Sequence, residues 1–587
     1  MPGEQLYHVK PLGPDFLKRL GAFLGAMDLA LEDFSHPAQD RNLKWNLRNA
    51  PGVIQSHLGH VEDQNRRELL ERLAQKFLER LEPLVPELRL GVIHGDANDH
   101  NILVAPLQPG DDPGSRSLVG LLDFGDAGQS YTAGEAAIAG AYAMLGKSDP
   151  FTVATHLVSG YHRAFPLRDE EIAALFPLMG LRLCTSVAIS AHQKKLEPHN
   201  DYLVVSEAPA WDLLERLDRE ILDIPTLLFR QACGLDPVPS SQGVMAWLES
   251  NGKDASPVVG TTSLGGGGDN PSLRPVDPAT APAHIFDFRP DSSEFPETPV
   301  MEDAEAWTEL LFGKMRAVQA QVGIGRYDEV RRWYTSDIFR AAGGDPPEWR
   351  TVHIGMDLFL PAGSPVLAPF DAVVHSVANN AGMLDYGPTV ILEHRVPLEL
   401  GGPLKFWTLY GHLAEGALAD LFPGQPVSKG EAFAQIGDFP INGNWAPHLH
   451  FQIMTDLLGH AGEFPGVAPP SQRLLWKAIS PDPNMILGIP QSVTATSNRA
   501  QWGSYHPGTS KAGEPSGSPL SGSFGRSMEE ILEAREKHLG PTLSIAYEKP
   551  LKIVRGSGCF LYDDGGQPFL DCVNNVPHVG HNLSLIH

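Results

Sequence analysis

The stretch "GNWAPHLHFQI", residues 443–453, places two histidines, His448 and His450, one residue apart in a segment typical of a β-strand. Successive strand side chains point to opposite faces, so residues i and i+2 lie on the same face. The sequence therefore predicts two imidazoles side by side on one face of a sheet. A catalytic zinc site commonly takes three protein ligands and keeps one position for water, so further ligands are needed.

Two upstream segments supply candidates for those ligands. "TVHIGMDLFLPAG", residues 351–363, contains His353 and Asp357, and "TLYGHL" contains His412. A zinc triad could consist of His353, Asp357 and His450, and its bound water would become a usable nucleophile. The other two histidines, His412 and His448, would then be available to move protons or to stabilise an oxyanion. The spacing alone leaves open which of His448 and His450 binds the metal.

The order "HIGMD", "LYGHL", "HLH" extends over a longer matching frame that includes "PAGSPVLAPFDAVV", "YGPTVILEH" and "GQPVSKGEAFAQIGD". Residues 350–455 resemble the lysostaphin/LytM-type zinc endopeptidases, a small β-sheet fold that cleaves peptidoglycan cross-bridges. The resemblance implies that the zinc ligands are His353, Asp357 and His450. It also implies a catalytic pair, His412 and His448. An alternative is a sheet that keeps its ligands but no longer hydrolyses peptides.

A second motif lies in the first third of the chain. "GVIHGDANDHNILV", residues 91–104, has the pattern H-G-D-x-x-x-x-N with Asp96 and Asn101, and "VGLLDFGDAG" follows with Asp123. Phosphoryl transfer needs a carboxylate to accept the proton of the substrate hydroxyl and ligands for Mg²⁺ on the nucleotide. The base would be Asp96, and Asn101 and Asp123 would hold Mg-ATP.

Residues 5–230, which carry this motif, resemble the aminoglycoside phosphotransferase/choline kinase-like family, including kinases of amino alcohols such as hydroxylysine. Members of that family have an N-terminal lobe with a nucleotide-covering loop and a phosphate-gripping lysine. Neither feature precedes "EQLYHVKPLG", residues 4–13. We therefore expect this chain alone to be weak or inactive as a kinase, because ATP would lose much of its cradle.

The end of the chain resembles the opening segment of class III aminotransferases, which use pyridoxal phosphate (PLP). The resemblance rests on "HLGPTLSIAYEKPLKIVRGSGCFLYDDGGQPFLDCVNNVPHVGH", residues 538–581. In that family the Schiff-base lysine lies far downstream of this segment. PLP is therefore not expected in this chain.

These motifs and the composition between them predict a multidomain α+β protein. It would consist of a mostly helical kinase-like C-lobe, an all-β metallopeptidase-type sheet domain and a short α/β fragment. The expected boundaries are 1–235 for the kinase-like C-lobe, 236–300 for a Gly- and Pro-rich linker, 301–345 for a helical lead-in, 346–485 for the sheet domain, 486–526 for a flexible linker and 527–587 for the truncated aminotransferase segment.

Charge and composition exclude some partners. The net charge of −26 argues against nucleic acid and against anionic membranes, both of which require basic surfaces. Four cysteines without a CxxC pair are typical of a reducing compartment. The most apolar stretch, residues 171–190, contains Pro177 and Arg182 and is interpreted as a buried helix. With no secretory signal recognised, we expect a cytoplasmic protein.

Three functional hypotheses follow, and the sequence favours the first because only its site has every residue it needs. The first is a zinc metalloendopeptidase-like hydrolase acting on a peptide. The second is an ATP-dependent phosphotransferase acting on an amino alcohol or a similar small molecule, within a kinase/PLP phospho-lyase fusion. The third is a truncated, non-enzymatic product whose sheet serves as a binding module. The oligomeric state is left open.

Overall fold

The protein is described by a computed structural model over residues 3–9, 13–106, 116–197, 207–264, 271–290, 292–295, 303–331, 334, 337–340, 349–396 and 404–490, and over three short strands between 553 and 570. The chain divides into a compact unit over Met1–Thr494 and a second unit over Ala495–His587. Each unit is described by itself.

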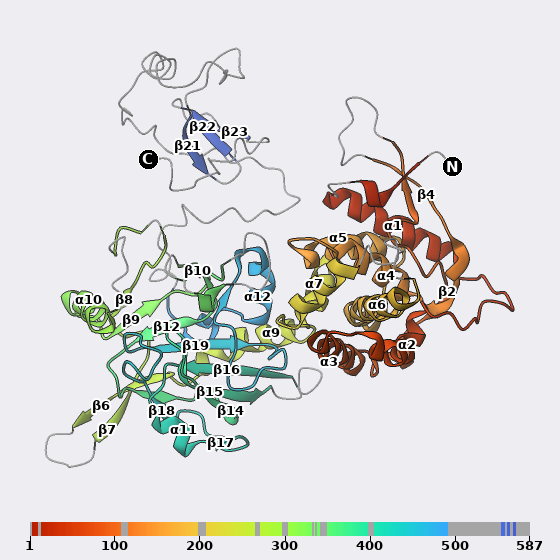
Figure 1. Ribbon diagram of the computed structural model, residues 1–587. Helices are drawn as coiled ribbons and strands as arrows, with labels where there is room; N and C mark the ends of the chain where they lie inside the picture. The colour runs from red at the N-terminus through yellow and green to blue at the C-terminus, as the bar shows by residue number, and fades with distance from the viewer. Residues whose placement is uncertain are drawn as a thin grey trace. The chain divides into compact units, whose positions relative to one another are not determined.

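The first part of the larger unit is mainly helical (Figure 1). Two small antiparallel sheets carry the loops of the H-G-D motif: β1 (Glu4–Gln5), β3 (Ile102–Val104) and β4 (Leu118–Leu121) form one, and β2 (Leu90–Ile93) and β5 (Gly128–Tyr131) form the other. The helices are α1 (Pro14–Leu31), α2 (Ala50–His57), α3 (Gln64–Leu81), α4 (Ala133–Met144), α5 (Pro150–Ala164), α6 (Asp169–Leu196), α7 (Glu207–Leu217) and α8 (Ile224–Ala232).

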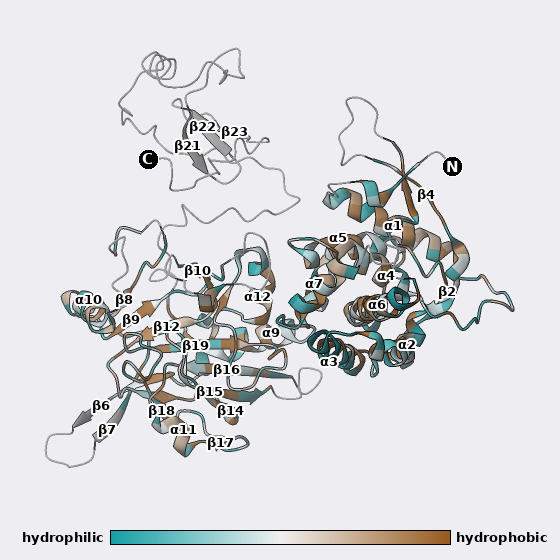
Figure 2. Cartoon of the chain, in the orientation of Figure 1, coloured by the Kyte–Doolittle hydropathy of each residue, from teal (hydrophilic) through white to brown (hydrophobic). Residues whose placement is uncertain are grey.

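Helix α6 is the central element of this helical region, and α2, α3, α4 and α7 pack against it. The hydrophobic side chains of its middle part do not keep to one face, and most of its residues are buried. Figure 2 shows brown, hydrophobic segments among the helices of this region. A helix without a polar face needs partners on all sides. Among the described residues α6 alone is long and apolar enough to cross a membrane, but 89% of its most apolar stretch is buried inside the protein. That burial agrees with the prediction of a buried helix over residues 171–190.

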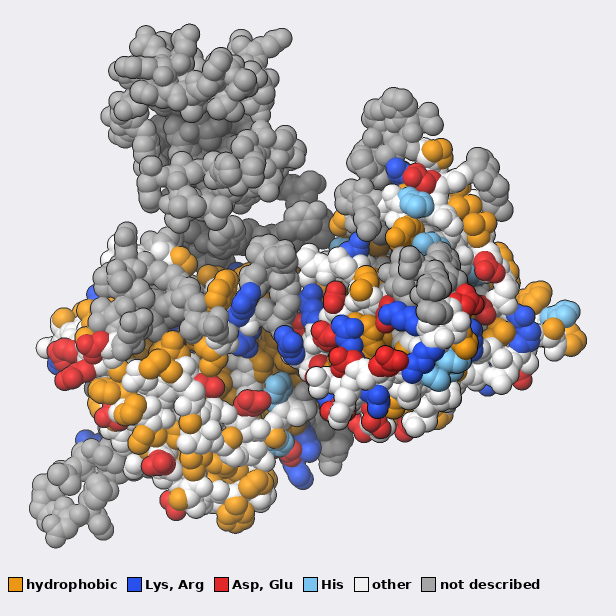
Figure 3. Space-filling model, viewed as in Figure 1, with side chains coloured by type: hydrophobic (Ala, Val, Ile, Leu, Met, Phe, Trp, Pro, Cys, Tyr) orange, Lys and Arg blue, Asp and Glu red, His pale blue; other side chains and the backbone are white. Residues whose placement is uncertain are grey.

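Charged side chains of both signs are interspersed on the face of the helical region drawn in Figure 3. Arginines spaced along α3 meet acidic residues of α7 and of the segment after it. The pairs are Arg66–Glu215, Arg72–Asp218 and Arg80–Asp223. Exposed ion pairs of this kind add little stability each, so we assign the stability of this region to its apolar core.

Helices α1 and α5 touch backbone to backbone through glycines. A Cβ atom added at Gly160 would lie 1.9 Å from the carbonyl oxygen of Lys18, and one added at Gly21 would lie 1.9 Å from that of Leu157. No side chain can move to relieve such a contact, because the obstacle is backbone. The two helices therefore require glycine at these positions.

We predict that Gly160→Ala lowers the free energy of unfolding by about 1–3 kcal/mol, the usual cost of overpacking a core. Thermal or urea unfolding of the full chain measures this change. The matched control is Gly52→Ala in α2, where nothing lies within 4 Å of the added Cβ. That control should be neutral or slightly stabilising, because alanine favours helix more than glycine. Equal stabilities of the two variants would contradict the close helix contact.

The second part of the larger unit is rich in β-structure. Its strands are β6 (Val259–Leu264), β7 (Pro271–Val276), β8 (Ala283–Ile285), β9 (Val322–Gly325), β10 (Glu329–Val330), β11 (Val352–His353), β12 (Met356–Phe359), β13 (Pro365–Leu367), β14 (Ala372–Asn380), β15 (Gly387–Arg395), β16 (Lys405–Gly411), β17 (Pro426–Val427), β18 (Ala432–Gln435), β19 (Leu449–Met454) and β20 (Val467–Ala468). The helices here are α9 (Ser241–Asn251), α10 (Ala304–Ala317), α11 (Gly416–Asp420), α12 (Arg473–Ile479) and α13 (Asn484–Leu487).

The main sheet has eight strands in the order β17-β14-β15-β16-β19-β12-β9-β8, whose middle strands run side by side in Figure 1. All its pairs are antiparallel except β8–β9. The same region contains two smaller sheets, with strand orders β18-β13-β6-β7 and β10-β11-β20. The predicted order, a mainly helical region followed by a sheet-rich region, is confirmed.

Both faces of the main sheet are covered. Leu449, Phe451 and Ile453 of β19 belong to one hydrophobic cluster, and Met454 belongs to another. Because side chains alternate along a strand, His450 lies on the face opposite to Leu449 and Phe451. The face that carries His450 is therefore buried as well.

The structure corrects the predicted linker over 236–300. Helix α9 buries Val244 and Leu248 in the core of the sheet region, β6 pairs with β13, and β8 pairs with β9 of the main sheet. The predicted lead-in over 301–345 contains helix α10, but it also contributes β9 and β10 to the sheets. Gly and Pro mark the turns between short strands as well as linkers, so composition alone misplaced this boundary.

In the smaller unit, the described residues form an antiparallel sheet of β21 (Ile553–Ser557), β22 (Phe560–Asp563) and β23 (Pro568–Leu570). The rest of the predicted aminotransferase segment over 527–587, and residues 491–526 of the predicted second linker, lie outside the described residues. The remainder of that second linker belongs to the sheet region, where Ile489 is part of the core.

Candidate functional sites

The central strands of the main sheet bring the predicted metal ligands together. Asp357 of β12 pairs directly with His450 of β19, and Gly411 of β16 pairs with His450 from the other side. His353 ends β11, just before β12 begins. Strand register therefore places ligands that are almost a hundred residues apart in sequence side by side.

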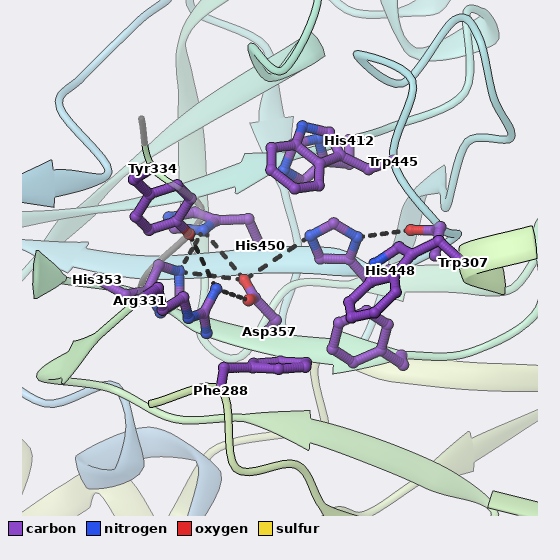
Figure 4. Close-up of a pocket in the computed structure, with 12 residues that line it drawn as sticks. Phe288, Trp307, Arg331, Tyr334, His353, Asp357, His412, Trp445, His448 and His450 are labelled. Atoms are coloured by element: carbon purple, nitrogen blue, oxygen red, sulfur yellow. Dashed lines mark hydrogen bonds and ion pairs between the residues drawn. The ribbon is translucent and has the colours of Figure 1, made fainter. Parts of the chain in front are cut away.

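Three ligand atoms meet in a nearly regular triangle, shown in Figure 4. His353 Nε2 lies 3.2 Å from Asp357 Oδ1 and 3.1 Å from His450 Nδ1, and the latter two atoms are 3.2 Å apart. All three side chains are buried, at 2%, 2% and 3% exposure. These atoms could hold a single metal ion.

Hydrogen bonds at the far nitrogens determine which ring nitrogens face the triangle as lone pairs. His353 Nδ1 lies 2.9 Å from the carbonyl oxygen of Arg326, to which it donates. His450 Nε2 lies 3.0 Å from Gln452 Oε1. The amide nitrogen of Gln452 donates to Pro465 O and Ser480 Oγ, so Oε1 is the atom left to accept from His450. A neutral imidazole has one N–H, so His353 Nε2 and His450 Nδ1 are both unprotonated.

The electrostatics of the site favour the protonation states that bind metal. Burial, with a contribution from Arg331, lowers the pKa of His353 to about 4. Burial alone would raise the pKa of Asp357, but His353 and Arg331 outweigh burial and hold that pKa well below its usual value. At neutral pH the site therefore presents a neutral imidazole and a carboxylate, the forms that coordinate metals.

A buried arginine that the sequence analysis missed holds the other carboxylate oxygen. Arg331 Nη1 lies 2.7 Å from Asp357 Oδ2 and 2.9 Å from Tyr334 Oη, and Arg331 Nε lies 3.2 Å from Glu329 Oε2. This leaves Asp357 Oδ1 alone to face the triangle. The arginine lies in the predicted lead-in, 26 residues before its partner, and no motif spacing marked it.

The remaining two histidines form a pair beside the triangle. The rings of His412 and His448 are 4.3 Å apart between centroids. His412 Nδ1 donates to Asn442 O at 2.8 Å and His448 Nδ1 donates to Ala446 O at 2.7 Å, which leaves Nε2 of each ring as a lone pair. Burial lowers the pKa of both imidazoles. His448 Nε2 lies 3.8 Å from Asp357 Oδ1, so this nitrogen is next to the ligand triangle.

His412 also adopts an unusual backbone conformation, with φ of 64° in the left-handed region. For a residue with a side chain this conformation costs roughly 1 kcal/mol and occurs often at functional sites. The turn after β16 thereby directs the imidazole back toward His448.

The ligand triangle lies next to a cavity. A pocket of about 40 Å³ lies directly at the site, and a larger cavity of about 500 Å³ shares His353, His412, His450 and Trp445 with it. The larger volume is within the range of clefts that take small ligands or short peptide segments.

The H-G-D motif forms a second polar site, in the helical region. Asp96 follows β2, and its Oδ2 accepts hydrogen bonds from Asn98 Nδ2 and Asn101 Nδ2, both at 2.9 Å. Arg182 Nη2 donates to Asp96 Oδ1 at 2.6 Å. The carboxylate is thus held on both oxygens.

Asp123 lies on the loop after β4, at a left-handed φ of 58°, and its carboxylate accepts from the backbone N–H of Gly125. The Asn101 and Asp123 loops are joined by a backbone hydrogen bond from Leu122 to Asn101, 2.8 Å long. The predicted residues therefore lie on adjacent loops. Asp126, which the sequence analysis did not single out, is close enough to Asp96 that burial and Asp96 together raise its pKa.

Arg182 is the other residue that sequence reasoning missed. Its guanidinium lies 4.5 Å from the Trp45 ring and 5.4 Å from the Tyr142 ring, and it donates to Trp45 O at 3.0 Å. A single arginine in an apolar helix was interpreted as evidence against a membrane span. It also signals a buried anionic partner, because buried charges are paired.

Packing at the ligand triangle requires glycine at position 355, the glycine of "HIGMD". A Cβ added at Gly355 would lie 2.4 Å from His450 Nε2. We predict that Gly355→Ala displaces the His450 ring from Gln452 and weakens metal binding by about 10- to 100-fold, as other losses of ligand support do. Titration with a competing chelator measures this. Gly416→Ala, where nothing lies within 4 Å, is the control that should bind metal like the parent.

Comparison with known proteins finds a family match in each of these two regions. Residues 1–171 match the family model of the phosphotransferase enzyme family, and residues 351–461 match that of peptidase family M23.

Among individual proteins, hydroxylysine kinase of Mus musculus is 32% identical over 222 residues, which are 37% of this chain and 58% of that protein. The chain thus spans less than two thirds of this relative. The alanine–glyoxylate aminotransferase 2-like protein of Drosophila melanogaster is 46% identical over 56 residues, 9% of this chain and 11% of that protein. The solved structure of a microcompartment-associated aminopropanol kinase is 21% identical, covers 37% of this chain and 66% of its own, and has a TM-score of 0.30. The chain thus combines a region that matches the phosphotransferase enzyme family, a region that matches peptidase family M23, and a short stretch similar to the aminotransferase-like protein above and to an ethanolamine-phosphate phospho-lyase homolog of Caenorhabditis elegans.

Proposed function

We propose that the sheet region is a zinc-dependent peptidase whose metal is held by His353, Asp357 and His450. The observation that supports this most is the triangle of unprotonated donor atoms 3.1–3.2 Å apart. Zinc binds nitrogen and oxygen at about 2.0–2.1 Å, so two donors on a tetrahedral ion stand about 3.3–3.4 Å apart. Two imidazoles and one carboxylate are also a donor set that zinc accepts while keeping a position open.

The two histidines outside the ligand triangle would transfer protons. When bound, zinc would supply a Lewis acid and a water of lowered pKa. His448 Nε2, the lone pair nearest to the triangle, would accept the proton of the attacking water. His412 Nε2 is also an acceptor, because its single N–H is used on Asn442 O. Once protonated, either imidazole could donate to the developing oxyanion or to the leaving amine.

The test combines metal content and peptide cleavage in the purified full chain. We expect about one zinc per chain in the parent and almost none in His353→Ala, because one of three ligands is lost. His448→Ala should keep its zinc but lose about 10²- to 10⁴-fold in cleavage, the usual contribution of a proton-transferring group. Glycine-rich peptides are the first substrates to try. A folded parent that takes up no zinc, even after zinc is added, would contradict this function.

As a second function we propose that the helical region transfers a phosphoryl group from ATP to the hydroxyl of a small amine-bearing molecule, with Asp96 as the base. The proposal is supported by the carboxylate held between Asn101 and Arg182, and by similarity to proteins named hydroxylysine kinase. In this assignment Asp96 accepts the hydroxyl proton, and Asn101 and Asp123 bind Mg²⁺ with the nucleotide.

We predict that Asp96→Asn reduces phosphorylation of hydroxylysine, followed with labelled ATP, by at least about 100-fold, because the amide cannot accept the proton. Glu79→Gln, an exposed change on α3, is the control and should match the parent. Phosphorylation that survives in Asp96→Asn would contradict the assignment of the base. If a folded parent neither phosphorylates nor cleaves, the sheet acts as a binding module instead.

A further inference from the structure

The two oxygens of the Asp357 carboxylate contact different partners. The oxygen nearest to His353, His450 and His448 is Oδ1 in every case, at 3.2, 3.2 and 3.8 Å. The other oxygen, Oδ2, accepts a hydrogen bond of 2.7 Å from Arg331 Nη1, and Figure 4 marks these contacts with dashed lines. A carboxylate can bind a metal ion through one oxygen or through both. In this protein the second oxygen already has a partner.

The guanidinium of Arg331 is fixed on its other sides as well. Nη1 also donates to Tyr334 Oη at 2.9 Å, and Nε donates to Glu329 Oε2 at 3.2 Å. The centre of the Phe288 ring lies 5.0 Å from the guanidinium carbon, and Arg331 is only 4% exposed. These contacts hold the guanidinium at the Asp357 carboxylate and away from solvent.

A glycine of the neighbouring strand β9 packs against this ion pair. Gly325 pairs with Asp357 across the main sheet, and a Cβ added to it would lie 2.8 Å from Arg331 Nη2 and 2.9 Å from Asp357 Oδ2. Protein atoms therefore occupy the space next to Oδ2 on this side. Both Arg331 and Gly325 precede residues 351–461, so the ion pair is built by a part of the chain outside the match to peptidase family M23.

The number of oxygens that Asp357 offers affects which metal ion the site prefers. Zn²⁺ commonly binds three protein donors and one water in a four-coordinate site. Mn²⁺, like Mg²⁺ and Ca²⁺, suits sites with more ligands, most of them oxygen. With Oδ2 occupied, His353, Asp357 and His450 offer three donor atoms. With both oxygens free, the same residues would offer four.

We propose that Arg331 is a positioning residue that restricts Asp357 to one metal-binding oxygen and thereby makes the site prefer Zn²⁺ to Mn²⁺. The proposal rests on the proposed function for the presence of a metal at the ligand triangle, but it does not depend on peptide cleavage. Arg331 supplies no ligand and moves no proton. It acts through Asp357 alone.

Metal binding to the purified full chain, freed of metal beforehand, tests this role. Co²⁺ can replace zinc at such a site, and its visible absorption is stronger in a four-coordinate site than in one with more ligands. We expect strong absorption per bound Co²⁺ in the parent and weaker absorption in Arg331→Met, where the second oxygen of Asp357 is free to bind. Competition between Zn²⁺ and Mn²⁺ should show the preference for Zn²⁺ reduced about 10-fold or more, in the range found when the support of a ligand is lost.

Two further variants make the result specific to the contact with Asp357. Arg331→Lys keeps the charge but loses the rigid fork of donors, so it should shift both readouts in the same direction by a smaller amount. Tyr334→Phe removes another partner of the same guanidinium and leaves the Asp357 contact, so it should match the parent. In Arg331→Met the buried Glu329 keeps Arg326 as a partner at 3.5 Å. Thermal unfolding establishes that each variant is folded, and Arg331→Lys decides the test if Arg331→Met is not.

The outcomes separate this inference from the proposed function. A parent that binds metal, with the same spectrum and preference in both Arg331 variants, overturns the positioning role even if peptides are cleaved. An equal change in Tyr334→Phe also overturns it, because the effect would then come from loosening of the whole network. A parent whose preference depends on Arg331 but that cleaves no peptide supports the positioning role and contradicts the peptidase function. A folded parent that takes up no metal contradicts both.

Discussion

Three electron-rich atoms held against one another inside a buried sheet are the constraint on which the rest of the sheet region depends. The lone pairs of His353 Nε2 and His450 Nδ1 and the charge of Asp357 Oδ1 meet within 3.2 Å. Without a cation such atoms repel, and burial in a medium of low dielectric constant strengthens the repulsion. The fold resists this repulsion through Gln452 and the Arg326 carbonyl, which hold the rings from behind, and through Arg331, which holds the carboxylate.

The helical region solves a related problem in another way. Asp96 is also a half-buried carboxylate, but it faces a fully buried guanidinium, that of Arg182, and two amides. The aromatic rings of Trp45 and Tyr142 flank the arginine and shield it from solvent. In both regions a buried arginine holds one carboxylate oxygen. The sites differ at the other oxygen, which accepts from two amides in Asp96 but faces two imidazole lone pairs in Asp357.

Most of what the sequence could predict came from the spacing of residues within short motifs. Alternation predicted His448 and His450 on one strand face; His450 does lie in β19 opposite Asp357, whereas His448 directly precedes that strand. The motif residues of the helical region lie on two adjacent loops, after β2 and after β4. Arg331 was missed because its partner Asp357 lies on β12, and only the folded register brings them together. The boundary at residue 346 was wrong because Gly and Pro mark turns between short strands as well as linkers.

That misplaced boundary has a consequence for how the sheet is protected. Strand β12, which carries Asp357, is covered on one side by β19 and on the other by β9, from the stretch expected to precede the domain. A piece cut to the apparent homology region would leave β12 as an unpaired edge, with a row of free backbone donors and acceptors beside the site. Such edges pair readily with other chains, so aggregation would start at the strand that carries Asp357. The segment between the two regions that match family models therefore protects the edge of the sheet.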